Sequence, residues 1–327
     1  MSLRIIREGL LDTVQDLGRK GFQHLGINPG GVMDRFSAQL ANALLGIEPD
    51  APVLELHFPS AQILFESQTV IAICGADFDP IINQESVPMH HPIAIAENSL
   101  LQFRQMKKGA RVYVAILNGL QLEPWKGSYS TNLKAGAGGF QGRALRKYDQ
   151  IFFSRQINIS KLLGEKCFSV LPWKALDTIE HREAIEFVIG SEWHSLDAES
   201  RKEFEQHWFQ IGRDSDRMGY KLKGPVLKLT ETDILSSGVG FGTVQLLPDR
   251  SLIVLMADHQ TTGGYPRIAH VISAHLPILA QKNPGDVFMF KMTDLETAEE
   301  KISRQQKYLE EIRIACKFRI ENLVHVS

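Results

Sequence analysis

Short apolar runs separated by glycine, proline and asparagine dominate the pattern of this 327-residue chain. Such runs, bounded by turn formers, are typical of strands. They predict strands at residues 53–58, 61–65, 70–74, 100–103, 112–116, 151–153, 226–229, 242–247, 252–256 and 287–290. The close spacing of these strands indicates barrels.

Helical patterns are fewer. Residues 37–45 begin with a candidate N-cap, Ser37, and carry a face of small residues and leucines, while residues 196–208 are amphipathic and rich in charge. Residues 294–315 place apolar side chains at helical intervals, next to the capping-box spacing of Thr293 and Glu296. We expect a C-terminal helix that packs on its own domain or, alternatively, binds a partner.

A similarity between two segments of the chain indicates two related domains. Residues 90–106 resemble residues 274–292: each segment has a histidine, a Pro-Ile pair, a polar turn and an apolar strand. An Asp-Arg pair lies upstream of each, Asp34-Arg35 and Asp216-Arg217. Two copies are too few for a solenoid. The pattern therefore predicts a mainly β chain with some α, built as two tandem barrels over residues 1–180 and 181–327, with a terminal helix in the second.

Composition narrows the classes of function. A net charge of −2 supplies no positive field for nucleic acid. Three dispersed cysteines without a CxxC pair indicate neither a disulfide framework nor structural zinc, which suits a reducing cytosol. The longest apolar stretch, residues 70–76, is far shorter than a membrane span. We expect a cytoplasmic protein with no nucleic-acid or membrane partner.

Glycine-rich segments in the first half are candidates for anion binding. Residues 13–27 offer Gln15 and Arg19 beside glycines, with a turn held by a structural salt bridge as the alternative. Residues 128–143 combine Ser130 and Thr131 with Gly139 and Arg143, which suits phosphate or carboxylate binding through backbone N–H groups. No nucleotide fingerprint of the GxGxxG or GxxxxGK type is present, and a flexible surface loop is the alternative.

Two segments of the second half carry further candidates. In residues 214–225, Arg217 offers a two-pronged donor for an anion and Asp216 could orient it or act as a base, the alternative being a surface ion pair. Residues 257–268 place amide and hydroxyl groups before a double-glycine turn, with a tight hairpin as the alternative. The candidates there are Gln260, Thr261, Gly263, Gly264 and Tyr265.

Metal and serine-hydrolase chemistry find no support in the pattern. HExxH and GxSxG are both absent, and His270 and His275 do not share a helical face. We therefore expect no metal site built by this chain.

Ordered motifs resemble the carboxyltransferase-like family. They are TVQDLGRKG, GVMDRFSAQLANALLG, GGFQGRAL, SDRMGYKLKGP, DHQTTGGYPRI and LAQKNPGD, and they cover nearly the whole chain. The family includes the C component of bacterial ATP-dependent 5-oxoprolinase, which the motifs resemble most, antagonists of a sporulation kinase inhibitor, and the carboxyltransferase region of urea carboxylase. The chain departs from the family at Ile47, where asparagine is common, and at Tyr148, where glycine is common.

The resemblance implies two cyclophilin-like barrels that act with two partner proteins of 5-oxoprolinase, a kinase-inhibitor-like B component and an A component. The B and C components would phosphorylate the 5-oxoproline lactam with ATP, accompanied by Mg²⁺, and the A component would open the ring to glutamate. The chain alone would be inactive. Arg19, Arg143 and Arg217 would contact anions, and Asp34 and Asp216 would orient groups or act as bases. Gln260, Thr261 and the Gly263-Gly264 turn would hold the substrate.

Two other functions stay open at this point. One is a regulatory protein that relieves a kinase inhibitor, and the other is a carboxyltransferase of a biotin-dependent urea carboxylase. Lys291 lies in a Phe-Lys-Met sequence that superficially resembles the Met-Lys-Met of a biotin carrier. It lies at the end of a predicted strand, however, and not at the exposed tip of a hairpin. We therefore expect no biotin attachment in this chain.

Overall fold

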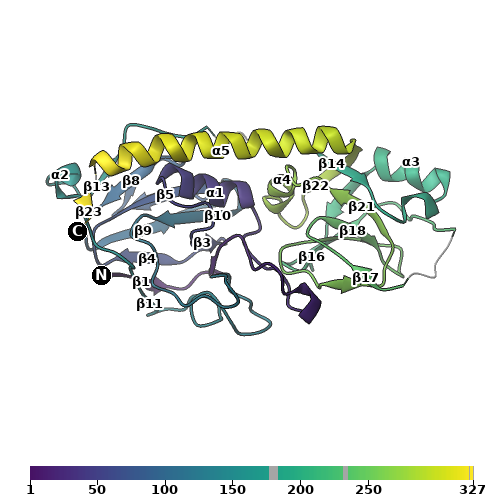
Figure 1. The fold of residues 1–327 in the computed structure, drawn as a ribbon, viewed down its shortest axis with the longest axis horizontal. Coiled ribbons are helices and arrows are strands. Elements are labelled where there is room, and N and C mark those ends of the chain that lie inside the picture. Colours follow the sequence, from purple (N-terminus) through teal and green to yellow (C-terminus); the bar gives the residue numbers. More distant parts are fainter. Residues whose placement is uncertain (177–182, 231–234, 324, 327) are drawn as a thin grey trace. The chain divides into compact units, whose positions relative to one another are not determined.

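The protein, seen in a computed structural model, is described for residues 1–176, 183–230, 235–323 and 325–326 (Figure 1). It forms two compact units. Unit 1 comprises Met1–Gly18, Asp34–Thr178 and Gln306–Ser327, and unit 2 comprises Arg19–Met33 and Ile179–Gln305. The expected boundary at residues 180 and 181 lies outside the described residues. The units differ from two consecutive halves in residues 19–33, which belong to unit 2, and 306–327, which belong to unit 1.

Unit 1 contains two six-stranded sheets. The first has the order β11 (Gln150–Phe152), β1 (Ser2–Arg7), β4 (Gln62–Phe65), β9 (Ser99–Phe103), β6 (Pro80–Ile82) and β7 (Glu85–Ser86). The second has the order β13 (Phe168–Val170), β8 (Pro92–Ile95), β5 (Thr69–Asp77), β10 (Lys108–Ile116), β3 (Val53–Leu56) and β2 (Thr13–Gln15). Beside them lie the short helix α2 (Ser160–Leu163), and β12 (Ile157–Asn158) paired with β23 (His325–Val326).

The core of unit 1 fills the space between these sheets. Inward side chains come from both, for example Leu3 and Ile63 from the first sheet and Val112 and Val114 from the second. The outer face of the second sheet is covered by α1 (Arg35–Leu44), which packs on β5 and β10. Because β5 is covered on both faces, its sequence is almost continuously apolar instead of alternating.

Helix α1 begins earlier than the sequence predicts. Its N-cap is Asp34, whose Oδ1 accepts from the Ser37 backbone N–H at 2.9 Å and whose Oδ2 accepts from the Ser37 hydroxyl at 2.6 Å. The expectation that Ser37 caps the helix was wrong, because a carboxylate three residues upstream reaches the same orphan N–H.

Gly46 follows α1 in the left-handed region, with φ of +63°. A Cβ built there would lie 2.3 Å from the Cα of Lys317, a backbone atom that cannot turn aside. Gly136 has a similar φ of +62° but nothing within 4 Å of its Cβ position.

We expect Gly46→Ala to destabilise unit 1 more than Gly136→Ala. The control change carries only the left-handed backbone cost, about 1 kcal/mol, whereas Gly46→Ala adds a backbone clash with the C-terminal helix. Urea unfolding of both variants measures the difference. Equal losses would show that the contact between Gly46 and Lys317 does not constrain the fold.

Unit 2 contains a closed barrel. Its strand order is β14 (Ala184–Ile189), β21 (Arg267–Val271), β18 (Thr243–Leu246), β19 (Leu252–Leu255), β16 (Gly219–Lys223), β15 (Trp208–Ile211) and β22 (Val287–Met292). Strands β14 and β22 close it with a parallel pairing. The other elements are α3 (Ala198–Gln206), α4 (Leu276–Ala280), the 3₁₀ turns Gln23–Leu25 and Trp193–Ser195, and the pair β17 (Ser237–Gly238) and β20 (Thr262–Gly263). The mainly β class, a closed barrel in unit 2 and the C-terminal helix are confirmed, and unit 1 has two six-stranded sheets where a first barrel was expected.

Aromatic rings fill the barrel on the side of α3. Phe204 of α3 stacks on Phe290 of β22 with ring centroids 4.4 Å apart, and Phe187 meets Phe204 edge to face at 5.0 Å. Such pairs add about 0.5–1.5 kcal/mol beyond the area they bury. The apolar residues of α3 therefore join the helix to the barrel.

The strand predicted at residues 226–229 was wrong. Leu227 is buried, but the segment is held by α3 instead of a sheet ladder. The backbone N–H of Lys228 donates to the Ser200 hydroxyl at 2.8 Å, and its carbonyl accepts from the Asp197 N–H at 3.3 Å. Apolar content alone did not distinguish a buried loop from a strand.

The similarity between residues 90–106 and residues 274–292 is only partly reflected in their structures. Residues 99–103 and 287–292 are strands in their respective units, as expected. The two Pro-Ile segments differ, because Pro92 starts strand β8 and Pro277 lies in the first turn of helix α4. Proline is tolerated at both places, since neither position needs its missing N–H.

The long helix α5 (Leu295–Leu323) extends beyond its predicted end at residue 315. The buried side chains Leu309, Cys316 and Ile320 continue the helical period, and this part belongs to unit 1. Asp294, not Thr293, caps the helix by accepting from the Thr297 N–H at 2.7 Å. Across the described part of the chain, no helix is long and apolar enough to cross a membrane.

Asp12 makes the stability of unit 1 depend on pH. Burial raises the pKa of its carboxyl to about 7, although the backbone N–H groups of His57 and Ala61 donate to it at 2.8 and 2.6 Å and favour the charged form. The folded state therefore binds this proton more tightly than the unfolded chain. Its stabilisation is complete below the unfolded pKa of 3.8 and is lost as pH rises through about 7.

We expect the wild type to lose stability relative to Asp12→Asn between pH 4 and pH 7.5, because the amide has no proton to lose. Urea unfolding of both proteins across this range measures the difference. Parallel pH profiles would contradict the expectation.

Candidate functional site

Asp16 organises the glycine-rich loop of unit 1. Its Oδ1 accepts from the hydroxyls of Ser128 and Ser130 at 2.7 and 2.5 Å and from the Gly18 N–H at 2.8 Å, while Oδ2 accepts from the Tyr129 N–H at 2.6 Å. Residues more than a hundred positions apart are thus joined by one carboxylate that is 6% exposed. The sequence predicts that Ser130 contacts a ligand. In the structure the Ser130 hydroxyl donates to the Asp16 carboxylate.

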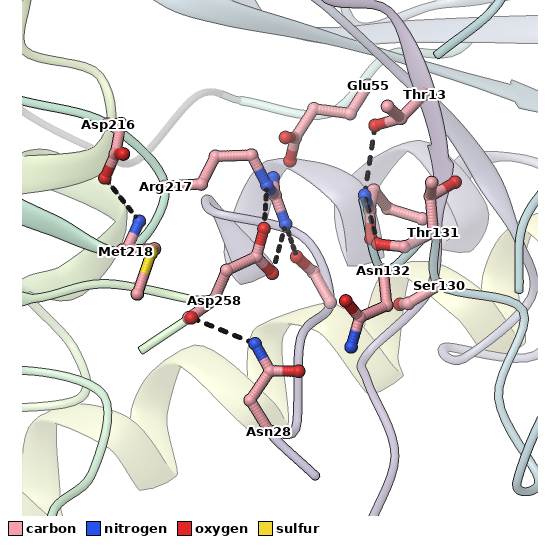
Figure 2. A network of polar contacts seen from close by, with 12 residues as sticks. Thr13, Asn28, Glu55, Ser130, Thr131, Asn132, Asp216, Arg217, Met218 and Asp258 are labelled. Atoms are coloured by element: carbon pink, nitrogen blue, oxygen red, sulfur yellow. Dashed lines mark hydrogen bonds and ion pairs between the residues drawn. The ribbon is translucent and has the colours of Figure 1, made fainter. Parts of the chain in front are cut away.

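Gln15, Thr131 and Gly139 are brought together next to Asp16. The Gln15 amide donates to the hydroxyl of Thr13 at 3.0 Å and to the carbonyl of Thr131 at 3.4 Å, and both of these acceptor residues are labelled in Figure 2. The Thr131 hydroxyl donates to the Val14 carbonyl at 2.8 Å. A Cβ at Gly139 would lie 1.9 Å from the Thr131 hydroxyl oxygen, so only glycine fits there. The three predicted residues form one rigid corner of the loop.

Arg143 lies apart from this corner. Its two terminal nitrogens donate to the carboxylate of Asp149 at 2.7 and 2.8 Å, and one of them also donates to the Gln141 side chain at 2.7 Å. Two parallel charge-assisted hydrogen bonds are a strong and directional arrangement. An anion at Arg143 would have to displace or share with Asp149.

A row of polar side chains crosses the outer face of the second sheet in unit 1. Thr13 of β2 is paired in register with Glu55 of β3, and Glu55 with Tyr113 of β10. The Tyr113 hydroxyl donates to Glu55 at 2.9 Å and accepts from the Asp34 N–H at 2.8 Å. Burial, followed by the charges of Glu55 and Asp34, raises the pKa of Tyr113 well above its ordinary value, so the phenol remains a donor.

Sequence reasoning missed Glu55 and Tyr113. Their signal was present, because each occupies the polar position of an otherwise apolar strand, Val-Leu-Glu-Leu and Val-Tyr-Val. A fully buried carboxylate within such a strand is rare unless it is paired. Asp34, which was predicted, joins this row through its backbone and caps α1 with its side chain.

Arg217 is the centre of a buried polar cluster in unit 2. Its Nε donates to Asp258 Oδ2 at 2.7 Å, and one terminal nitrogen donates to Asp258 Oδ1 at 3.2 Å and to the Gly31 carbonyl at 2.6 Å (Figure 2). The two side chains are only 6% and 15% exposed. Arg217 therefore belongs to a buried ion pair with Asp258 and not to an exposed surface pair.

The 19–33 segment folds onto this pair. Asn28 donates from its amide to the Asp258 carbonyl at 2.9 Å, and the Arg19 N–H donates to the Pro29 carbonyl at 2.8 Å. A Cβ at Gly30 would lie 2.9 Å from an Arg19 terminal nitrogen and 3.6 Å from Asp258 Oδ1. Glycine at position 30 thus lets the buried Arg19 and the carboxylate of Asp258 approach the same loop.

Asp216 does not orient Arg217, contrary to expectation. Its Oδ1 accepts from the N–H groups of Met218 and Gly219 at 2.7 and 3.2 Å, forming a local turn. Asp258 holds the guanidinium instead. It was inside the Asp-His-Gln motif but was not chosen from the sequence, because the pairing spans 41 residues.

The predicted residues from Gln260 to Tyr265 form a short extended segment. Strand β20 pairs with β17, and the Val239 N–H donates to the Thr261 carbonyl at 3.1 Å. A Cβ at Gly263 would lie 2.6 Å from the Gln245 amide and 3.3 Å from the Gln260 amide. Gly263 therefore brings the backbone against two carboxamides, whereas Gly264 and Tyr265 line a separate cavity of about 470 Å³ in unit 2.

The cluster of unit 2 offers the buried guanidinium of Arg217, whereas the cluster of unit 1 is built around the buried carboxylate of Asp16. Buried guanidinium groups and oriented carboxamides bind carboxylates and phosphates directionally. Within the described ranges, His, Cys, Asp and Glu form no group of three or more that could hold a metal.

Comparison with known proteins identifies the family of this chain. The model of the carboxyltransferase domain, subdomain A and B, matches residues 25–292, which include Arg217, Asp258 and Gln260. The chain belongs to this carboxyltransferase family.

Two bacterial relatives match almost end to end. One, from Escherichia coli, is 34% identical over 95% of this chain and 97% of its own length, and another, from Haemophilus influenzae, is 30% identical over 92% and 94%. Both are named as the C subunit of 5-oxoprolinase. The crystal structure of urea amidolyase from K. lactis shares the fold, with a TM-score of 0.87 and 24% identity over 95% of this chain and 20% of that one.

Proposed function

We propose that this chain is the C component of an ATP-dependent 5-oxoprolinase, and that it works in the cytoplasm with a B component and an A component. The observation that carries the proposal is the end-to-end match to two bacterial proteins of that name, at 34% and 30% identity. With the B component, the chain would transfer the γ-phosphoryl group of ATP to the lactam oxygen, and the A component would open the activated ring.

The chemistry explains the need for anion-binding groups. A lactam is a poor electrophile, but breaking the bond to ADP and forming a phosphorus–oxygen bond at the lactam oxygen makes that oxygen a leaving group. Both the substrate carboxylate and the phosphates then need fixed donors. We assign Arg217, which an anion would share with Asp258, and Arg19 to the substrate carboxylate.

The remaining roles follow from placement. We assign the carboxamide of Gln260 and the backbone of Gly263 to the small substrate. The two groups are neighbours, because a Cβ at Gly263 would lie 3.3 Å from the Gln260 amide nitrogen. Asp16, Ser130, Thr131 and Gly139 hold the loop of unit 1 in shape. Mg²⁺ would accompany the phosphates of ATP, as is usual for this cation.

Reconstitution of the three components from adjacent genes of one organism tests the proposal. We expect glutamate, ADP and phosphate to form from 5-oxoproline and ATP, with no turnover by this chain alone. Absence of both glutamate and ADP from a mixture of the three folded proteins would overturn it, and so would oxoprolinase activity of the single chain.

A second function is favoured by a specific likeness. Urea amidolyase from Saccharomyces cerevisiae is 27% identical over 91% of this chain but only 17% of its own length. A carboxyltransferase of that kind would move a carboxyl group from carboxybiotin to urea. Transfer of labelled carboxyl from a carboxylated biotin carrier to urea, in the absence of 5-oxoproline, would support this function over the first.

A further inference from the structure

The cavity of about 470 Å³ in unit 2 combines an apolar lining with two cations. Leu227, Leu246, Pro248 and Pro266 supply apolar walls, and Tyr265 adds an aromatic ring. Lys228 and Arg250 lie in the same lining. Small-molecule sites are typically apolar cavities of about 300–1,000 Å³ with a few placed polar groups.

Hydrogen bonds fix the walls of this cavity in advance. The Leu246 N–H donates to the Pro266 carbonyl at 3.0 Å, and the Gln245 amide donates to the Tyr265 carbonyl at 3.3 Å. Lys228 is anchored through its backbone to α3, as described above, and the Arg250 N–H donates to the Leu247 carbonyl at 2.8 Å. A cavity whose walls are held by such hydrogen bonds loses less entropy when a ligand binds.

Both cations remain available to an anion. Lys228 and Arg250 are exposed, and among the described residues neither lies within 4.0 Å of an acid oxygen. Hydrogen bonds from Ser200 and, to a smaller extent, the charge of Lys228 lower the pKa of Asp197. The acid nearest in sequence to Arg250 is engaged locally, because Asp249 Oδ1 accepts from the N–H and hydroxyl of Ser251 at 3.0 and 2.6 Å. Two exposed cations beside a leucine- and proline-lined cavity therefore favour a ligand with both a ring and negative charge.

We infer that this cavity binds a nucleoside phosphate. The base lies among Leu246, Pro248 and Tyr265, and the phosphates contact Lys228 and Arg250. A simple polyanion would contact only the two cations, Lys228 and Arg250. An apolar peptide would contact only the apolar side chains of the cavity. The inference deepens the proposed function and rests on it for the choice of ATP as the nucleotide.

Isothermal titration of the full chain with ATP, adenosine and tripolyphosphate tests the site. We expect ATP to bind most tightly, and Lys228→Ala and Arg250→Ala each to weaken ATP about tenfold while leaving adenosine unchanged. Tyr265→Ala should weaken both ATP and adenosine. Lys202→Ala and Arg213→Ala are matched controls, because they remove exposed cations of unit 2 that lie outside the cavity.

The titration and the kinetics of the reconstituted complex test the nucleotide site separately from the proposed function. No ATP binding by the folded chain, equal affinities for ATP and tripolyphosphate, or unchanged affinity in the cavity variants would overturn the inference. An active reconstituted complex with normal KM for ATP in Lys228→Ala and Arg250→Ala would also overturn it while sparing the proposed function. An inactive complex with cavity-dependent ATP binding would overturn only the proposed function.

Discussion

Arg217→Ala is expected to lower the oxoproline-dependent turnover of the reconstituted complex by about 100-fold or more, as the loss of a preorganised anion donor typically does. The change removes both contacts to Asp258 and the contact to the Gly31 carbonyl. It also leaves a mostly buried carboxylate without its cation, which costs about 3 kcal/mol of stability. Steady-state kinetics and urea unfolding measure the two effects.

Two further variants separate charge from geometry. Arg217→Lys keeps the charge but loses the two-pronged contact, so its turnover should lie between the wild type and alanine. Arg213→Ala removes an exposed arginine four positions away and should behave as the wild type. Each variant should still form the complex with the B component in a pull-down. Wild-type turnover in folded Arg217→Ala would show that the buried pair is structural only.

Asp16→Ala is expected to destabilise unit 1 by about 3 kcal/mol or more, because buried donors left without an acceptor each cost about 1–3 kcal/mol. The carboxylate accepts from two backbone N–H groups, of Gly18 and Tyr129, and from two hydroxyls, of Ser128 and Ser130. The hydroxyls can turn to other partners, but the amides are fixed. Chemical denaturation of the purified chain measures the loss.

Two matched changes check the explanation. Asp50→Ala removes an exposed aspartate of unit 1 and should leave stability within about 0.5 kcal/mol of the wild type. Asp16→Asn keeps one acceptor oxygen and should fall between the two. If Asp16→Ala were as stable as Asp50→Ala, the cluster around Asp16 would not hold the loop.

Local patterns located some of the strands but missed others, among them β1, β8, β14, β16 and β21. Each predicted strand of unit 1 overlaps an observed one, because the apolar runs are short and bounded by turns. The error at residues 226–229 has a tertiary cause: the backbone of Lys228 bonds to Asp197 and Ser200 of a different segment. Helix caps were also misplaced, because the carboxylates of Asp34 and Asp294 accept from the first free N–H groups in place of Ser37 and Thr293.

The site was predicted in its parts and not in its pairings. Gln15, Ser130, Thr131 and Gly139 were chosen from two separate segments, and the structure joins them at one corner. Asp216 was chosen as the partner of Arg217 because it is adjacent in sequence. The observed partner, Asp258, lies on the loop after β19, which the barrel brings back to Arg217.

The sequence by itself determined the mainly β class, the C-terminal helix and the motifs that place the chain in its family, since these depend on local periodicity and on residue identity in order. Only the tertiary structure decided which groups hold one another. Antiparallel pairing placed Thr13, Glu55 and Tyr113 in one row, and the return of residues 19–33 to unit 2 placed Asn28 and Gly31 on the Arg217 pair. Such contacts join residues up to 230 positions apart, and no local pattern records them.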